Sequence, residues 1–191
     1  MYNYKKMFVM LFLGFGSGLP YILLISTSTA WLRDVNVDLS YIGFFTWITF
    51  TYTFKFAWAP LVDRFSIPFL AQYGHRKSWI AFMQILIFLS LLFISNIDPI
   101  ENFILFCMVG ATIAFAGSIQ DIAIDAFRIE YAHISDQGNL AASYQLGYRL
   151  AIIAATSIAL IFADINGWSM TFKLMAGLMC LGLLGVIFSK E

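Results

Sequence analysis

The chain has 191 residues, of which 61% are hydrophobic, 18% aromatic and only 12% charged, and its formal net charge is zero. Soluble domains carry about 45–50% apolar and about 25% charged residues, and a soluble fold of this length cannot bury so much apolar surface. Lipid is therefore the expected solvent. The sequence has no long basic run, which argues against a nucleic-acid partner, because nucleic acid requires a clustered cationic face.

Six apolar stretches qualify as membrane-spanning helices, which need about 20 mostly apolar residues. They cover residues 7–31, 41–62, 79–94, 103–126, 140–163 and 168–188. The first stretch begins like a signal peptide, but no small-x-small cleavage site closes it, so we interpret it as an uncleaved helix. The polar turns between the stretches are too short to form a domain. We therefore predict an all-α polytopic membrane protein, with residues 1–191 forming a single bundle of about six transmembrane helices.

Basic residues near the helix ends gather on one face of this arrangement, and such an excess marks cytoplasmic loops. With the N-terminus inside, the inner face holds Lys5, Lys6, Arg64, Arg76, Lys77, Arg128 and Lys190. The outer face holds only Arg33. We therefore expect both termini to lie in the cytoplasm.

Three basic residues, Lys55, Arg149 and Lys173, lie inside the predicted helices, where a charge costs roughly 2.5–3.5 kcal/mol and is usually paired or part of a pathway. Lys173, near the outer end of the sixth helix, can extend to the interface along its apolar stem. Arg149 lies roughly 14 Å into the fifth helix, near the middle of the hydrocarbon core. It is either a structural ion pair between two helices or a cationic anchor for an anionic substrate. Lys55, in the second helix, either extends to the inner face along its apolar stem or belongs to the same pathway.

Two acidic residues accompany them in the fourth helix. Asp121, Asp125 and Arg128 are spaced i, i+4 and i+7, which places them on one narrow helix face. A solvated helix end with a local Asp125–Arg128 pair accounts for the last two. Asp121 lies deeper, where carboxylates of pumps and transporters relay protons, so Asp121 and Asp125 are candidates for a substrate or proton pathway.

Gly14, Gly16, Gly18 and Pro20 interrupt the first helix. Small residues permit close helix approach, and a helix weakened by glycine and proline kinks or opens at a site. Residues 110–117 of the fourth helix are similarly rich in small side chains, and the first and fourth helices are equivalent in a three-plus-three inverted repeat. We therefore predict a flexible motif in the first helix.

No residue pattern points to catalysis or to a metal site. Cys107 and Cys180 lie in apolar runs without a CxxC motif or a Cys/His cluster, so we interpret them as buried, inert thiols. His75 and His133 lie in predicted inner loops, far apart in the sequence. The sequence therefore predicts neither an enzyme nor a bound metal or cofactor.

Five motifs are similar, in order, to those of the AmpG-type permeases, bacterial inner-membrane members of the major facilitator superfamily. They are GFGSGLP (14–20), YTFKFAWAPLVDR (52–64), HRKSW (75–79), QDIAIDAFR (120–128) and LGYRL (146–150). The related acetyl-CoA transporters share part of this pattern. The resemblance implies a six-helix major-facilitator bundle and proton-driven import of anhydro-muropeptides that are recycled from cell-wall turnover.

The same resemblance implies a gating function for the turn between the second and third helices. Asp63, Arg64, Arg76 and Lys77 look like the superfamily's signature loop, which helps to latch the inner gate. No separate role follows from the resemblance for Asp121, Asp125 or Arg149.

Family members contain two six-helix bundles that hold the substrate between them, and this chain matches only the first. One expectation is therefore a half-transporter that pairs with a separate C-terminal half or with a second copy of itself. The alternatives are a truncated, non-transporting remnant or scaffold, and a transporter of another solute such as acetyl-CoA.

Overall fold

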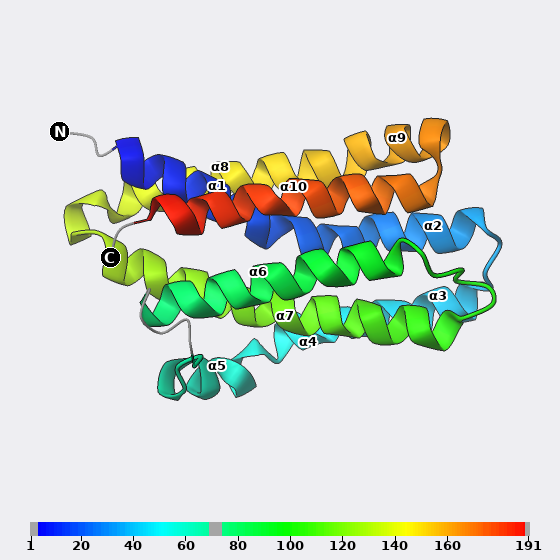
Figure 1. Cartoon of the computed structure of the whole chain (residues 1–191), viewed down its shortest axis with the longest axis horizontal. Coiled ribbons are helices and arrows are strands. Elements are labelled where there is room, and N and C mark those ends of the chain that lie inside the picture. Colours follow the sequence, from blue (N-terminus) through cyan, green and yellow to red (C-terminus); the bar gives the residue numbers. More distant parts are fainter. Residues whose placement is uncertain (1–3, 69–73, 190–191) are drawn as a thin grey trace.

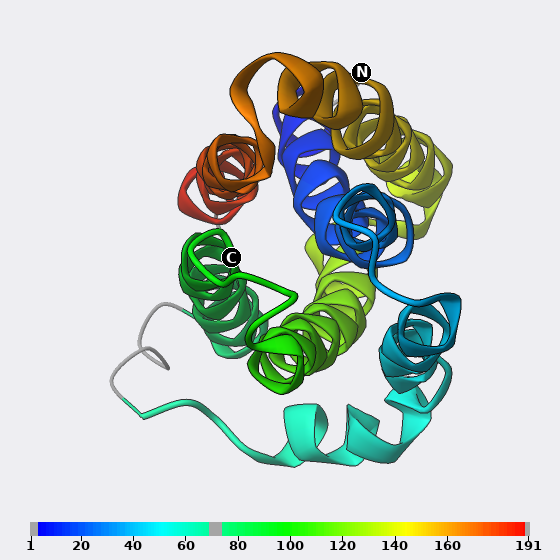
Figure 2. The same ribbon diagram turned by 90° about the vertical axis from the view of Figure 1, so that its right-hand side faces the viewer.

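The computed structural model describes residues 4–68 and 74–189, so Lys190, one of the basic residues of the predicted inner face, lies outside the described residues. Over the described ranges the regular elements are all helical. Most helices run side by side along the long axis, whereas α5 (Lys55–Arg64) lies across it, and both ends of the chain lie at the same end of the bundle (Figure 1 and Figure 2). The prediction of an all-helical polytopic chain is confirmed.

The helices form six crossing units in chain order. The first consists of α1 (Tyr4–Ile22), the π-helix η1 (Leu23–Thr27) and α2 (Ser28–Asp34). The second consists of α3 (Leu39–Thr46), the 3₁₀ turn η2 (Trp47–Thr49), α4 (Phe50–Thr53) and α5 (Lys55–Arg64). The third and fourth are α6 (His75–Ile94) and α7 (Phe103–Tyr131). The fifth consists of η4 (Ile134–Asp136), α8 (Gln137–Ile153), the π-helix η5 (Ala154–Ile158) and α9 (Ala159–Asn166), and the sixth is α10 (Trp168–Phe188).

Five of these units are continuous helices that are long and apolar enough to cross a membrane. The second unit, predicted as one span over 41–62, is helical but is divided by a 3₁₀ turn and by a break at Phe54. The hydroxyls of Thr46, Thr49 and Thr51 each donate to the carbonyl three residues earlier. Such side-chain bonds compete with the regular helical pattern. The bundle therefore has about six crossings, as predicted, with an irregular second one.

The first crossing is the hub of the bundle, because α1 packs against α8, α10 and α7. Its contact with α8 brings the two backbones together. A Cβ atom at Gly14 would collide with the carbonyl of Tyr144, and one at Gly147 would collide with the carbonyl of Leu11. Glycine on both sides thus permits the close approach that small residues provide in membrane helices. Figure 2 shows α1 beside α8, with the second crossing on the outside of α7.

The small residues of the fourth crossing accommodate the second crossing in the same way. A Cβ atom at Gly110 would lie 2.9 Å from the ring of Phe45, and one at Gly117 would collide with the hydroxyl of Tyr52. The glycines of residues 110–117 are therefore contact positions for bulky aromatic side chains.

The predicted interruption of the first helix is not found, and the flexibility of its glycine- and proline-containing motif stays a prediction. α1 continues through Gly14, Gly16, Gly18 and Pro20, all of which are buried, and ends at Ile22. Close packing against α8 and α10 holds this part of the helix regular. Proline is tolerated in a membrane helix where its neighbours compensate for the lost hydrogen bond.

The irregular part of the first crossing comes immediately after this motif. The π-helix η1 packs against η5, the π-helix of the fifth crossing. The hydroxyl of Thr27, which is fully buried, donates to the carbonyl of Ala155. Two widened helical turns therefore meet, and they are joined by a side-chain bond to a backbone carbonyl.

The crossing of α1 and α8 predicts a clear contrast between two glycines. Gly14→Ala should lower the free energy of unfolding by about 1–3 kcal/mol, because the new methyl group overpacks the helix contact. Gly177→Ala on α10 meets no atom within 4 Å, and it should be neutral or stabilise by up to about 1 kcal/mol, because alanine favours helix more than glycine does. Thermal unfolding of both variants in detergent tests this contrast, and equal stability would contradict the close crossing.

Candidate functional site

A hydrogen-bond chain joins three crossings around Asp121. The hydroxyl of Ser17 on α1 donates to Oδ1 of Asp121 on α7, over 2.5 Å. The same hydroxyl lies 2.7 Å from Oη of Tyr144 on α8. A serine hydroxyl has a single hydrogen, so when it donates to an ionised Asp121, Tyr144 must be the donor to Ser17. Which groups donate and which accept in these hydrogen bonds thus depends on whether Asp121 carries a proton.

A cavity of about 310 Å³ lies beside the hydrogen bonds around Asp121. Its lining combines aromatic rings, hydroxyl groups and two chargeable side chains. The lining residues are Tyr21, Thr49, Phe50, Tyr52, Thr53, Lys55, Asp121 and Tyr148. The rings of Tyr21 and Tyr52 pack edge to face with centroids 4.9 Å apart. The first, second, fourth and fifth crossings therefore contribute to one polar flank of the bundle.

Lys55 connects the second crossing with the fourth. Its Nζ lies 4.0 Å from Oδ2 of Asp125, and Oδ1 of Asp125 lies 3.6 Å from Nη2 of Arg128. The predicted Asp125–Arg128 pair is confirmed. The side chains of Lys55 and Asp125 are 44% and 46% exposed, so their attraction contributes little to stability, typically about 0–1 kcal/mol. Lys55 therefore remains available to another anion at this flank.

Arg149 lies on the surface of α8, directly after the cavity residue Tyr148. It has no ion-pair partner among residues 4–68 and 74–189. The structural pair between helices is therefore not found in this part of the chain, and the role of Arg149 as an anchor for an anionic substrate stays a prediction.

A second charged cluster lies at the end of the bundle that holds both termini. Nη1 of Arg76 lies 2.7 Å from Oδ1 of Asp63, and its Nε lies 3.2 Å from Oε1 of Glu130. Arg76 is in the first turn of α6, Asp63 is near the end of α5, and Glu130 is near the end of α7. One guanidinium thus ties together the ends of three crossings.

The residues around this cluster bind neighbouring main chain. Lys77 donates to the carbonyl of Ser189 over 2.9 Å, and Nε2 of His75 lies 2.8 Å from the carbonyl of Val62. His75, Arg76 and Lys77 form the first turn of α6, so the prediction that His75 lies in a loop is wrong. Arg64 is exposed at the end of α5 and forms no ion pair among the described residues.

Sequence reasoning missed several of the residues that hold these groups, among them Ser17, Tyr144 and Glu130. Tyr144 lies just before the motif at 146–150, and only its helical spacing of four from Tyr148 would have indicated a shared helix face. Glu130 lies two residues beyond the motif that ends at Arg128. The predicted fourth helix ends at residue 126, which places Glu130 in a polar turn, whereas α7 extends to Tyr131.

The cysteines and the acidic residues do not form a metal site in the described part of the chain. No group of three or more His, Cys, Asp or Glu residues there is close enough to hold an ion. Cys107 is half-buried, whereas Cys180 is exposed on α10, which corrects the prediction that both thiols are buried.

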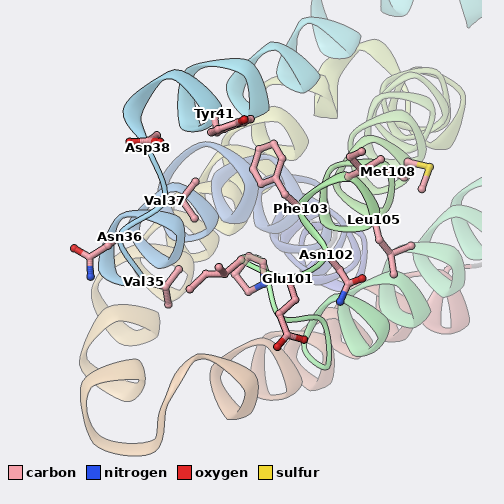
Figure 3. Close-up of a pocket in the computed structure, with 13 residues that line it drawn as sticks. Val35, Asn36, Val37, Asp38, Tyr41, Glu101, Asn102, Phe103, Leu105 and Met108 are labelled. Carbon is pink, nitrogen blue, oxygen red and sulfur yellow. The ribbon is translucent and has the colours of Figure 1, made fainter.

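A larger cavity of about 770 Å³ opens at the opposite end of the bundle (Figure 3). It lies between the turn that joins α2 to α3 and the start of α7, and its labelled lining residues include Asp38, Tyr41, Glu101 and Phe103. None of the residues predicted from the sequence to form a site lines this cavity. It is separate from the cavity that holds Lys55 and Asp121.

Comparison with known proteins places this geometry in a family. Residues 5–191 match the family model of the Major Facilitator Superfamily. The chain belongs to the major facilitator superfamily. This membership agrees with the multi-pass helical architecture of the chain.

The chain is also similar to individual members of the superfamily. It is 35% identical over 184 residues to the "Anhydromuropeptide permease" of Escherichia coli, an alignment that covers 96% of this chain and 37% of the relative. It is 33% identical over 188 residues to "Putative transporter AmpG 4" of Rickettsia conorii, covering 97% of this chain and 45% of the relative. The chain thus spans less than half the length of these curated relatives.

The cluster around Arg76 predicts a modest and salt-sensitive coupling. A double-mutant cycle of Arg76→Gln and Asp63→Asn should give a coupling free energy of about 1 kcal/mol or less, because the Asp63 side chain is 57% exposed. The coupling should fall at high salt, where exposed charges are screened. Arg64→Gln serves as the matched control and should show no coupling to Asp63. Denaturant unfolding at low and high salt measures both, and a large coupling that salt leaves unchanged would contradict the exposed pair.

Proposed function

We propose that this chain forms one six-helix bundle of a proton-coupled importer of anhydro-muropeptides, equivalent to the N-terminal half of an AmpG-type permease. The observation that carries the proposal is the cavity that combines Lys55, Asp121 and several tyrosine rings on one flank. The similarity to an anhydromuropeptide permease supports the choice of solute.

The chemistry of this flank suits such a solute. Anhydro-muropeptides present sugar rings, hydroxyl groups and carboxylates. The rings of Tyr21, Tyr52 and Tyr148 offer apolar faces with hydroxyl groups at their edges, a combination that suits amphipathic ligands. Lys55 offers a cation for a carboxylate, and Arg149 supplies a second cation next to Tyr148.

Proton coupling follows from the charges at the same flank. The cavity lining has two chargeable side chains, Lys55 and Asp121, whose charges cancel when both are ionised. A proton on Asp121 leaves the positive charge of Lys55 uncompensated and favours binding of an anionic solute. Linkage then requires that the bound solute favours the proton by the same factor. Proton and anionic solute therefore bind together and cross together.

The cluster of Arg76, Asp63 and Glu130 has a mechanical role in this proposal. Alternating access in such transporters is largely rocking of one bundle against the other. Arg76, with Asp63 and Glu130, holds the ends of three crossings together so that they move as one body. Asp63, Arg64, Arg76 and Lys77 thereby form one side of the inner gate.

The proposed location is the bacterial inner membrane, with both termini in the cytoplasm. Contacts bring the basic residues to one end of the bundle, because Lys6 donates to the carbonyl of Tyr131 and Lys77 donates to that of Ser189. A basic end is the cytoplasmic end under the positive-inside rule. The polar flank requires a covering partner, either a second six-helix bundle of a separate half or a second copy of this chain.

Uptake of labelled anhydro-muropeptide tests the proposal. Cells that lack their own permease should take up the label when this chain is expressed with the C-terminal half of a related permease. Asp121→Asn keeps the oxygen that accepts from Ser17 but cannot release a proton, and it should reduce uptake by about 5–150-fold, the range of typical coupling free energies. Lys55→Gln should also reduce uptake.

The matched control is Lys173→Gln, which removes a charge on the surface of α10, away from the cavity lining, and should leave uptake unchanged. Expression of the chain alone tests whether a second copy replaces the separate half. Uptake of acetyl-CoA instead of the muropeptide would overturn the proposed assignment of the solute. Absence of uptake in every combination, with the chain correctly inserted, would favour a non-transporting scaffold.

A further inference from the structure

Two glutamine side chains meet in the middle of the bundle without hydrogen-bond partners. Gln84 on α6 and Gln120 on α7 are both 0% exposed. Neither the amide nitrogen nor the amide oxygen of either residue has a partner in the described part of the chain. Four strong polar atoms are therefore enclosed at one place.

The amide nitrogens lie against two glycines, at positions that a Cβ atom would fill. A Cβ atom at Gly16 on α1 would lie 3.0 Å from Nε2 of Gln84 and 3.6 Å from Nε2 of Gln120. A Cβ atom at Gly182 on α10 would lie 2.6 Å from Nε2 of Gln84 and 3.2 Å from the Cα atom of Gly16. The first, third, fourth and sixth crossings thus converge on this point.

Burying these four polar atoms without hydrogen bonds costs free energy that a bound polar molecule would offset. A buried amide without hydrogen bonds costs several kcal/mol in an apolar environment, and lipid cannot supply a partner. Buried polar atoms in native proteins are satisfied by protein groups or by ordered water, which typically makes about three hydrogen bonds. Water fits the donor and acceptor atoms that two amides present, since each amide offers both kinds.

We propose that Gln84 and Gln120 form a buried water-binding site at the junction of α1, α6, α7 and α10. The site is distinct from the solute cavity, whose lining includes neither glutamine. The site is adjacent in sequence to the Ser17–Asp121 hydrogen bond on both α1 and α7. Ser17 directly follows Gly16 on α1, and Asp121 directly follows Gln120 on α7. Water at the junction therefore lies one residue along α1 and α7 from the Ser17–Asp121 hydrogen bond, on the interior side of the bundle.

The alternative is that the same two glutamines bond to each other without any bound water. Rotation of one amide by 180° about its terminal bond exchanges its nitrogen and oxygen, and the two assignments differ only in their hydrogen bonds. The glutamines would then bond directly to each other as a clamp between α6 and α7. The clamp and the hydrated site differ in whether water reaches the junction, which is measurable.

Radiolytic hydroxyl labelling of the full chain in lipid nanodiscs, in water enriched in ¹⁸O, distinguishes the two. Hydroxyl radicals formed from bound water oxidise the nearest reactive side chain. Met179 lies one turn before Gly182 on the same face of α10, and it is 0% exposed. Met175, also 0% exposed, lies one turn further from the junction and serves as the internal reference. We expect Met179 to take up ¹⁸O several-fold faster than Met175.

Two variants make the test specific. Gln84→Leu with Gln120→Leu removes all four polar atoms at similar volume, and the labelling rate of Met179 should fall to that of Met175. Gly177→Ala, on the exposed side of α10, should leave the ratio unchanged. Equal labelling of Met179 and Met175 in the unmodified chain would overturn the proposal in favour of the dry clamp, whether or not the double variant folds.

Discussion

Lipid offers no hydrogen-bond partner, and this constraint organises the bundle. Several polar groups on the crossing helices find partners within the protein. The hydroxyl of Thr27 bonds to a backbone carbonyl of the fifth crossing, and Ser17 bonds to Asp121. The amide of Gln137 donates to carbonyls at the end of α7, at Arg128, Ile129 and Ala132.

The close crossing of α1 with α8 determines where the remaining polar groups lie. Because glycines bring these backbones together, Ser17 comes within reach of Tyr144 on α8. The packing of α7 against α1 brings Asp121 to the same hydroxyl. Asp121 then faces the cavity that also holds Lys55. A proton on Asp121 would alter both the hydrogen-bond chain inside the bundle and the charge of the cavity wall. Packing, proton binding and solute binding thus depend on the same few side chains in the proposed mechanism.

The sequence predicted the apolar crossings and the Asp125–Arg128 pair, because both follow from local periodicity. It could not predict that α1 stays regular through Pro20, since that outcome depends on packing against helices distant in the sequence. The partners Tyr144 and Glu130 and the buried amide of Gln84 were missed for the same reason. Each is an ordinary residue of its own helix and acquires a role only when other helices are placed beside it.

In this mechanism the flank around Lys55 and Asp121 faces water rather than lipid. Thiol labelling distinguishes the two environments, in a chain whose Cys107 and Cys180 are replaced by alanine. Thr53→Cys, in the cavity lining, should react in intact membranes with a hydrophilic maleimide, because a thiol reacts as thiolate in water. Leu89→Cys, equally on the surface but on α6 at 54% exposure, should remain unlabelled. Labelling of Leu89→Cys without labelling of Thr53→Cys would show that this flank does not face water.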